Sequence, residues 1–238
     1  MIAPQDWHIY AAKLPLQTIT YSSIATIVPT IVKAASLHDT ERKSFREKGC
    51  VFDDEGKNIS LLNPFFCELT SIYWLINNVD HEYIGNAHYR RKWGDDGIRF
   101  SEEGTLYVAH EQRFEGGLAR QFLDNHHGFN APAVTIGLAE RGLIPFSPSQ
   151  MKAVWEQPMF YGYQMARGPR KHYQAFMKLA FDCLWPVWDE HQEEIKLFDD
   201  YNRRMMGFIG ERMMTGLVLC CDSFFDFPIA TSYVEYRP

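Results

Sequence analysis

The chain has 238 residues, of which 46% are hydrophobic and 15% aromatic, enough to bury the core of one large domain. Its formal net charge of −6 argues against a nucleic-acid-binding protein, which would need a basic surface. The five cysteines are scattered without a C-x-x-C pair, which favours a reducing compartment over a disulfide framework or a zinc site. No secretory signal or membrane-spanning stretch is recognisable, so we expect a cytoplasmic protein.

The first fifty residues predict a strand and then a helix. Residues 7–12 (WHIYAA) favour a strand. Apolar residues between positions 24 and 35 recur at helical spacing, with Pro29 as a kink or a start. A polar, charged stretch follows over residues 38–49, and no element is predicted there.

Residues 53–87 complete a strand–helix–strand order. Residues 53–63 are rich in Asp, Gly and Asn and predict a loop. Asn63 and Pro64 mark a helix start, with Asn at the N-cap and Pro at the first helical position. The helix is followed by a short buried strand over residues 83–87. This alternation predicts an α/β fold.

The remaining chain is irregular first and helical later. Residues 94–150 predict loops and short helical pieces, with one strand at 105–109. A further strand is expected at 159–165. Long amphipathic patterns predict helices over residues 171–195, bent by a proline, and over 202–220. No repeat or linker divides the chain, so we treat residues 1–238 as a single domain.

The sequence HYRR, from His88 to Arg91, directly follows the buried strand at 83–87. Arginine presents a planar fork of donors that matches phosphate oxygens, and ligands bind at the carboxyl ends of strands in α/β sheets. The sequence therefore predicts a phosphate site at His88, Tyr89, Arg90 and Arg91. The alternative is structural: one arginine pairs with Glu68, and His88 is a hydrogen-bonded core residue or a metal ligand.

Several motifs occur in one order along the chain, namely DEGKNIS (54–60), NP (63–64), CELT (67–70), YW (73–74), HYRR (88–91) and NRRMMGFIGER (202–212). Together they resemble the bacterial polysaccharide-biosynthesis glycosyltransferases catalogued as domain of unknown function 4422. The resemblance is dense from 53 to 93, clear from 158 to 229, and faint elsewhere.

The resemblance implies a GT-A-like α/β domain that binds a nucleotide sugar, with a mixed sheet flanked by helices. It implies transfer of a sugar, often a galactose form, from a UDP-sugar onto capsule, lipopolysaccharide or exopolysaccharide chains. The acceptor would be a glycan or lipid-linked oligosaccharide at the inner face of the inner membrane, reached peripherally or through partners. The oligomeric state is left open.

Family members hold the nucleotide with their first strand and loop, which places contacts at Ala11 and Lys13. The match there is only fair, so the base and ribose contacts are less defined than the diphosphate contacts. Asn58 and Asn63 either position the donor or only turn and cap the backbone. Arg204 binds phosphate or pairs with a carboxylate on its own helix.

Glu211 is our candidate catalytic base. It lies midway along the late amphipathic helix, on a face with Gly207 and Arg204 that leaves room for a ligand. The alternative is a surface salt bridge, worth less than ~1 kcal/mol. Glu68 is the second candidate base, although structural pairing to an arginine suits it better.

The sequence leaves the need for a metal open. It has no clean Asp-x-Asp, the pair with which many GT-A enzymes hold Mn²⁺ or Mg²⁺. Asp95 and Asp96, flanked by glycines, are either a metal site or an ordinary polar turn. The cluster at residues 124–127 (DNHH) is a metal site, an acceptor-binding loop or an exposed turn.

Two other functions compete with sugar transfer. One is a non-catalytic module that binds a nucleotide sugar or a glycan. The small number of acidic residues that are candidates for the site would suit such a module. The other is a metal-dependent hydrolase, which rests only on Asp95, Asp96 and the histidine pair. Release of UDP from a UDP-sugar separates the first rival from an enzyme. Activity that is unaffected by both EDTA and Asp95→Ala would remove the second.

Overall fold

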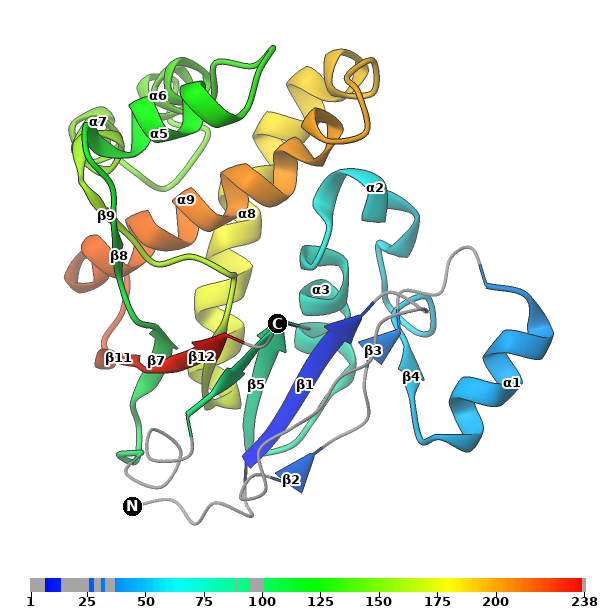
Figure 1. Ribbon diagram of the computed structural model, residues 1–238. Coiled ribbons are helices and arrows are strands. Elements are labelled where there is room, and N and C mark those ends of the chain that lie inside the picture. Colours follow the sequence, from blue (N-terminus) through cyan, green and yellow to red (C-terminus); the bar gives the residue numbers. More distant parts are fainter. Residues whose placement is uncertain are drawn as a thin grey trace.

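The structure is a computed structural model that describes residues 7–13, 26–27, 31–32, 37–88, 90–94 and 101–236. Within these residues, eight strands form one sheet in the order β11-β7-β10-β5-β1-β3-β4, with β2 paired to β1 (Figure 1). Their bounds are β1 Trp7–Lys13, β2 Thr26–Ile27, β3 Ile31–Val32, β4 Val51–Phe52, β5 Tyr83–His88, β7 Leu106–Ala109, β10 Ala166–Pro169 and β11 Ile229–Ser232.

The sheet is mixed, as predicted. Strands β4, β3, β1 and β5 run parallel, β10 is antiparallel to both β5 and β7, and β11 is parallel to β7. Because β1 and β5 are parallel and paired from Trp7↔Tyr83 to Ala12↔His88, both end at the same edge of the sheet. This edge carries the HYRR sequence.

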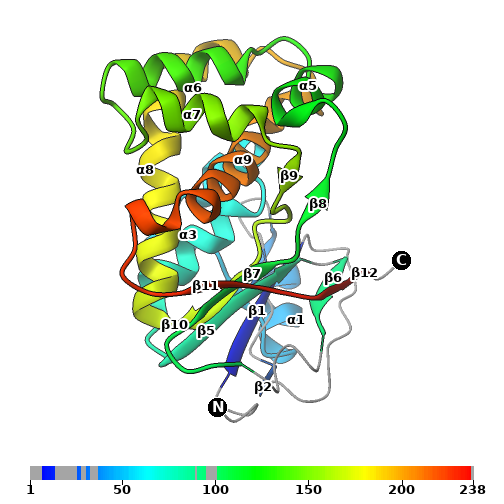
Figure 2. The same cartoon turned by 90° about the vertical axis from the view of Figure 1, so that its left-hand side faces the viewer.

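Two short ribbons extend from the sheet. Strand β6 (Arg91–Trp93) pairs antiparallel with β12 (Val234–Tyr236), so the end of the described chain lies beside the HYRR turn. Strand β8 (Gln112–Arg113) pairs with β9 (Met159–Phe160) and leads towards the upper helices (Figure 2).

The helices divide into those beside the sheet and those above it. Helix α3 and the long helix α8 lie beside the sheet, α9 crosses α8, and α5, α6 and α7 form a group at the far end (Figures 1 and 2). Their bounds are α1 Asp39–Glu47, α2 Asn63–Phe66, α3 Leu69–Asn78, α5 Gly117–Asn125, α6 Ala131–Glu140, α7 Pro148–Glu156, α8 Arg170–Ile195 and α9 Met205–Leu219.

The main core lies between the sheet and α3, α8 and α9. Helix α8 buries Phe176, Leu184 and Val187 completely, and it continues through Pro186. Fully buried Met205, Met206 and Met213 line α9 in the same core. Among the described residues, no helix is both long and apolar enough to cross a lipid bilayer.

Three predicted elements differ from the structure. Within the helix expected at 24–35, the described pairs Thr26–Ile27 and Ile31–Val32 are strands β2 and β3. Their β-branched residues suit an extended backbone, and a proline between the pairs opposes a helix. The strand expected at 159–165 ends at Phe160. Tyr163 and Gln164 have φ values of 71° and 53°, which an extended strand excludes.

The helix expected from Asn63 is broken. Cys67, with φ of 52°, separates α2 from α3, and the backbone N-cap of α2 is Leu62 rather than Asn63. Asn63 instead donates through Nδ2 to Cys67 O (2.9 Å) and Thr70 Oγ1 (3.1 Å), which fastens the break. The charged stretch at 38–49 contains helix α1, whose side chains are largely exposed. Because the stretch is polar throughout, its sequence did not predict a helix.

Candidate active site

A cavity of about 320 Å³ opens where the end of β5, the α2–α3 junction, the segment after β9 and the start of α9 meet. Its volume is at the lower end of the range for ligand pockets, about 300–1,000 Å³. Six residues predicted for the site line it together: Glu68, His88, Arg90, Arg91, Arg204 and Glu211.

The turn after β5 is set by His88. Its Nδ1 accepts a hydrogen bond from the backbone N–H of Arg90 (3.1 Å), so its Nε2 carries the proton in the neutral ring. That Nε2 faces Glu68 Oε1 at 3.9 Å. His88 therefore shapes the turn that carries Arg90 and links β5 to the α2–α3 junction.

The Arg91 guanidinium lies over two aromatic rings. Its Cζ lies 3.6 Å from the centroid of the Tyr163 ring and 5.5 Å from that of Tyr236. Tyr236 reaches this position because β12 pairs with β6, opposite Arg91 itself. Stacking occupies the faces of a guanidinium but leaves its N–H edges available, which is the side that binds phosphate.

Arg204 is the residue immediately before α9, and it lines the cavity. Its Nε donates to Cys67 Sγ (3.2 Å), and its Cζ lies 5.5 Å from the centroid of the Phe208 ring. This close approach depends on Gly207, where an added Cβ would lie 3.2 Å from Cys67 Sγ. The arginine is thus fixed across the cavity from the start of β6.

Glu211 presents a half-buried carboxylate to the cavity, with its side chain 22% exposed. Oε1 accepts from the backbone N–H of Tyr163 (2.9 Å) and Oε2 from Arg212 Nη1 (3.1 Å). Burial raises the pKa of the Glu211 carboxyl, whereas Arg212 and the Tyr163 N–H oppose that rise. Each oxygen keeps a further lone pair for a substrate proton.

Arg212 is a buried support for this carboxylate. Its Nη1 also donates to Phe208 O (2.9 Å), and its Nη2 donates to Gln121 Oε1 (2.6 Å). Its Cζ lies 4.7 Å from the centroid of the Phe160 ring. The side chain is only 2% exposed and ties α9 to α5 behind the cavity.

The cavity wall also concentrates backbone strain. Cys67, Tyr163 and Gln164 are the non-glycine residues with positive φ in the described chain, and all three line the cavity. Such conformations cost about 1–3 kcal/mol each and cluster at functional sites. The strained pair is held by Glu211, which accepts from Tyr163 N, and by Asn86 Nδ2, which donates to Gln164 O (2.8 Å).

His126 lines the cavity as a neutral, buried imidazole. It is 5% exposed and stacks on Phe208 with ring centroids 3.8 Å apart. Burial, followed by nearby Arg212 and Arg204, lowers its pKa to about 3. The rest of the predicted 124–127 cluster does not line the cavity: Asp124 pairs with Arg120 at the surface, and the His127 N–H donates to Asn202 Oδ1 (3.0 Å).

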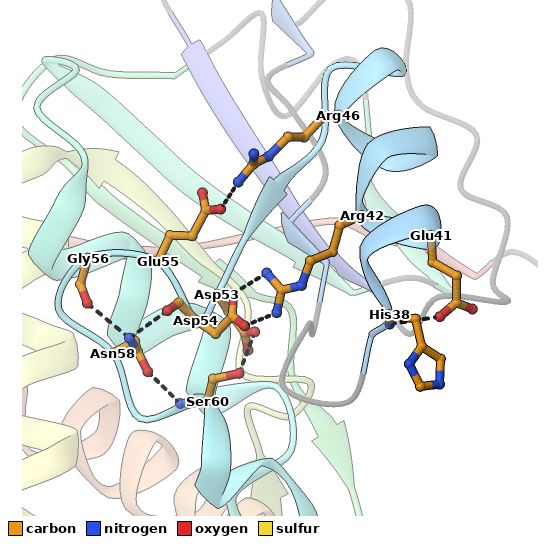
Figure 3. Close-up of polar contacts among 10 residues, drawn as sticks. All are labelled: His38, Glu41, Arg42, Arg46, Asp53, Asp54, Glu55, Gly56, Asn58 and Ser60. Atoms are coloured by element: carbon orange, nitrogen blue, oxygen red, sulfur yellow. Dashed lines mark hydrogen bonds and ion pairs between the residues drawn. The ribbon is translucent and has the colours of Figure 1, made fainter.

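Asn58 is not among the residues that line the cavity. Figure 3 shows its side chain inside its own loop, where Nδ2 donates to Asp54 O (3.0 Å) and Gly56 O (2.9 Å). Its Oδ1 accepts from Ser60 N (3.2 Å). Asn63 likewise bonds its own turn. The structure thus gives both asparagines a role in shaping the backbone.

Five predicted residues are described in part or not at all. Tyr89, Asp95 and Asp96 lie outside the described residues. Of Ala11 and Lys13 the structure describes the backbone, which lies in β1 next to the end of β5. The residues that are described bring no three His, Cys, Asp or Glu side chains together as a metal site.

The cavity is locally basic in an acidic protein. Four arginines and two carboxylates line it, whereas the whole chain has a net charge of −6. Low-dielectric walls around such a cluster favour an anionic ligand. Arg212 pairs with Glu211, and Arg90, Arg91 and Arg204 add three further positive charges to the lining of the cavity.

The sequence did not single out Gln121, Phe160, Tyr163, Gln164 or Phe208 as site residues. These five come from α5, β9, the segment after β9 and α9, and they meet only in the folded chain. For Phe208 a signal was present, because it lies three residues before Glu211 on the same helix. For Gln164 there was none, since a left-handed glutamine has no sequence signature.

Comparisons with known proteins bear on the family and the fold of this chain. The profile of the family described as "Domain of unknown function (DUF4422)" matches residues 25–123. The fold is similar to an apo structure of WbbM, a bifunctional glycosyltransferase, with a TM-score of 0.68 and 18% identity over 99% of this chain. The match covers 45% of that structure, so this chain spans less than half of its length.

No match was found among curated proteins. At 18% identity, the likeness to WbbM establishes a shared fold. The family resemblance drawn from the sequence motifs is confirmed over the matched range, which includes the HYRR turn. Residues 25–123 of this chain therefore match the model of the family described as domain of unknown function 4422, in agreement with the motifs.

Proposed function

We propose that this protein is a glycosyltransferase that moves a sugar from a UDP-sugar to a hydroxyl group of a bacterial surface polysaccharide. A galactose form is the leading donor sugar. The observation that carries the proposal is one cavity that joins Arg90, Arg91 and Arg204 to the half-buried carboxylate of Glu211. The fold shared with a bifunctional glycosyltransferase supports it.

The arginines suit the leaving group. When the bond between the anomeric carbon and the diphosphate oxygen breaks, negative charge accumulates on the diphosphate. Preorganised donors aimed at developing charge are a major source of catalysis. Such donors are Arg91, which lies over the Tyr163 and Tyr236 rings, and Arg204, whose Nε donates to Cys67 Sγ. Charge-assisted bonds from arginine to phosphate are also among the stronger hydrogen bonds.

Glu211 suits the acceptor. As the acceptor oxygen attacks the anomeric carbon, its proton passes to the Glu211 carboxylate and UDP leaves with the bonding electron pair. A base with a pKa raised towards neutrality is more effective, and burial shifts the pKa of Glu211 in that direction. A single displacement of this kind inverts the anomeric configuration. Glu68 lies on the same cavity and is the alternative base.

The acceptor belongs to the growing glycan, free or lipid-linked. In this proposal the enzyme works in the cytoplasm at the inner face of the inner membrane, through peripheral association or through partner proteins. A divalent cation, Mn²⁺ or Mg²⁺, is either required or replaced by the arginines. The binding experiment below separates these two cases.

Nucleotide binding tests the proposal. Calorimetry with UDP, GDP, CMP and UDP-sugars, with Mn²⁺ or with EDTA, should show preferential binding of UDP. The double variant Arg90→Ala/Arg91→Ala should lose this binding, and its turnover should fall by at least ~10²-fold. Arg203→Ala is the matched control, because Arg203 precedes Arg204 but pairs with Asp200 at the surface. Absence of nucleotide binding under every condition would refute the proposal.

Donor hydrolysis separates an enzyme from a binding module. Without acceptor, many transferases pass the sugar slowly to water, so UDP should be released from a UDP-sugar in a coupled assay. Glu211→Gln should suppress this release while UDP binding persists. Tight UDP-sugar binding without release, even with glycan acceptors, would favour the non-catalytic module.

A further inference from the structure

Three residues that line the cavity carry buried polar atoms without a hydrogen-bond partner among the described residues. Gln164 Oε1, His126 Nδ1 and Arg212 Nε are buried and have no hydrogen-bond partner within the described protein, and all three residues line the cavity. A buried polar atom without a partner costs about 1–3 kcal/mol, and native proteins contain few of them. Their position in the lining of the cavity points to a ligand as the missing partner.

The three side chains are joined through the first turns of α9. Gln164 Nε2 donates to Gly207 O (2.7 Å), His126 stacks on Phe208, and Arg212 Nη1 donates to Phe208 O. We call Gln164, His126 and Arg212 the α9 wall. The bond to Gly207 O fixes the orientation of the Gln164 amide, so its oxygen is the atom left over.

The α9 wall differs chemically from the arginines of the β5–β6 turn. Gln164 offers an acceptor, the neutral His126 ring offers a donor or an acceptor according to its tautomer, and Arg212 Nε offers a donor. The Arg212 charge is already paired with Glu211. Mixed donors and acceptors without net charge suit hydroxyl groups, which both donate and accept, better than phosphate.

The strained backbone also supports the interpretation that a ligand binds at the α9 wall. Tyr163 and Gln164 keep positive φ values, although neither is glycine. Asn86 holds this arrangement, because its Nδ2 donates to Gln164 O while its Oδ1 accepts from Ala166 N and Tyr173 OH. A backbone kept in this state at several points serves to place the Gln164 side chain.

We infer that the α9 wall is the subsite for the hydroxyl groups of the transferred sugar, with Gln164 and His126 as its specificity-determining residues. This inference rests on the proposed function, because it assumes that the arginines hold the diphosphate. It assigns separate binding roles to two parts of the cavity. The β5–β6 turn binds the nucleotide part, and the α9 wall recognises the sugar beside Glu211.

The test compares UDP with UDP-sugars in the same variants. Gln164→Ala and His126→Phe remove one polar partner each, and phenylalanine keeps the stacking on Phe208. Calorimetric Kd values for UDP should change by less than twofold. Those for the preferred sugar donor, chosen from UDP-galactose, UDP-glucose and UDP-N-acetylglucosamine, should rise about threefold to tenfold. Gln164→Gly, which suits a positive φ, replaces Gln164→Ala if that variant misfolds.

Matched controls exist outside the cavity. Gln174 Nε2 also donates to a backbone carbonyl, Ile76 O (2.8 Å), and His172 also stacks on a phenylalanine, Phe227, with an unpaired Nδ1. Gln174→Ala and His172→Phe should leave UDP and UDP-sugar binding alike. Equal weakening of UDP and UDP-sugar by the α9-wall variants, or no weakening of either, would overturn the inference.

Deoxy-sugar donors sharpen the assignment. For the wild type, removal of the hydroxyl bound by Gln164 should weaken binding as much as Gln164→Ala does, and the two changes together should add little. If UDP itself fails to bind the wild-type protein, the proposed function fails first, and the inference fails with it. If UDP binds and no deoxy-sugar shows this coupling, only the inference fails.

Discussion

The loop at residues 53–63 and the α9 wall are both rich in polar side chains, but they differ in whether their buried polar atoms have hydrogen-bond partners among the described residues. In the loop, buried Asp53 accepts from Ser60 Oγ (2.7 Å) and Thr70 Oγ1 (2.8 Å), and Asn58 bonds its own turn. In the wall, Gln164 and His126 keep buried polar atoms that have no partner in the part of the chain that the structure describes.

The difference teaches how to separate structural from functional polar residues in this protein. Both regions carry motifs of the same family resemblance, so a motif alone does not decide between them. The polar side chains of the loop bind partners within the protein, which indicates that the loop is a structural scaffold. Arg42 and Arg46 of α1 also pair with Asp54 and Glu55 of this loop (Figure 3). Unsaturated, strained positions mark the cavity as the place where a ligand binds.

The largest effect is expected at Glu211. Glu211→Gln keeps an oxygen for the Tyr163 N–H but removes the base, so kcat should fall about 10²–10⁴-fold with little change in UDP affinity. Glu190→Gln, which alters a surface pair with Arg141, is the control. A variant with near wild-type kcat would move the role of base to Glu68.

The pH dependence of kcat tests the same assignment. A base works only when ionised, so activity should fall as the pH drops through the pKa of Glu211. Because burial raises that pKa, the acid limb should lie above the ordinary glutamate value of about 4.3. The residual activity of Glu211→Gln should lack this limb; a limb that persists would belong to another group.

The lowered pKa of His126 makes the free energy of unfolding depend on pH. Its folded pKa of about 3 lies below the unfolded value of about 6.5, so the unfolded chain binds the extra proton first. The stabilisation is complete above pH 6.5 and is lost as the pH falls towards 3. At pH 5 the loss amounts to about 2 kcal/mol.

His126→Phe cannot bind this proton and keeps the stacking on Phe208. In urea unfolding at pH 7 and pH 5, its free energy of unfolding should therefore fall by about 2 kcal/mol less than that of the wild type. Parallel pH profiles for the two proteins would show that His126 is protonated in the folded state. The α9 wall would then be charged rather than neutral.

Asn58 tests the scaffold side of the comparison. Asn58→Ala removes two donors and one acceptor from the loop, which should lower the free energy of unfolding by about 1 kcal/mol. The KM for the UDP-sugar should stay unchanged, because Asn58 does not line the cavity. Urea titration and steady-state kinetics check the two parts, and a raised KM with intact stability would restore Asn58 as a donor contact.

The scaffold was more predictable than the cavity wall. The short buried strand β5 and the apolar stripes of α8 and α9 are local patterns, and the structure contains these elements close to their expected bounds. The HYRR arginines were predictable because a strand end and a charge pattern coincide there. Helix α1 was not, since its exposed surface leaves little apolar pattern to read.

The α9 wall could not be predicted for a physical reason. Gln164 and His126 are 38 residues apart in the sequence. What joins them is the fold, through Gly207 and Phe208. A left-handed backbone at Tyr163 and Gln164 is imposed by tertiary contacts with Glu211 and Asn86. No residue in that segment signals it, because neither position is a glycine.

The smallest effect is expected at Tyr236, which lies outside both regions but holds one face of Arg91. A cation–π contact at such a half-exposed site contributes about 0.5–1 kcal/mol, so Tyr236→Ala should weaken UDP binding about twofold to fivefold. Tyr236→Phe keeps the ring and should bind UDP as the wild type does. Tyr233→Ala is the control, because Tyr233 is equally exposed and stacks on His110 rather than on Arg91. If Tyr236→Phe also weakened binding, the hydroxyl group rather than the ring face would be the contact, and β12 would contribute to the site directly instead of by positioning Arg91.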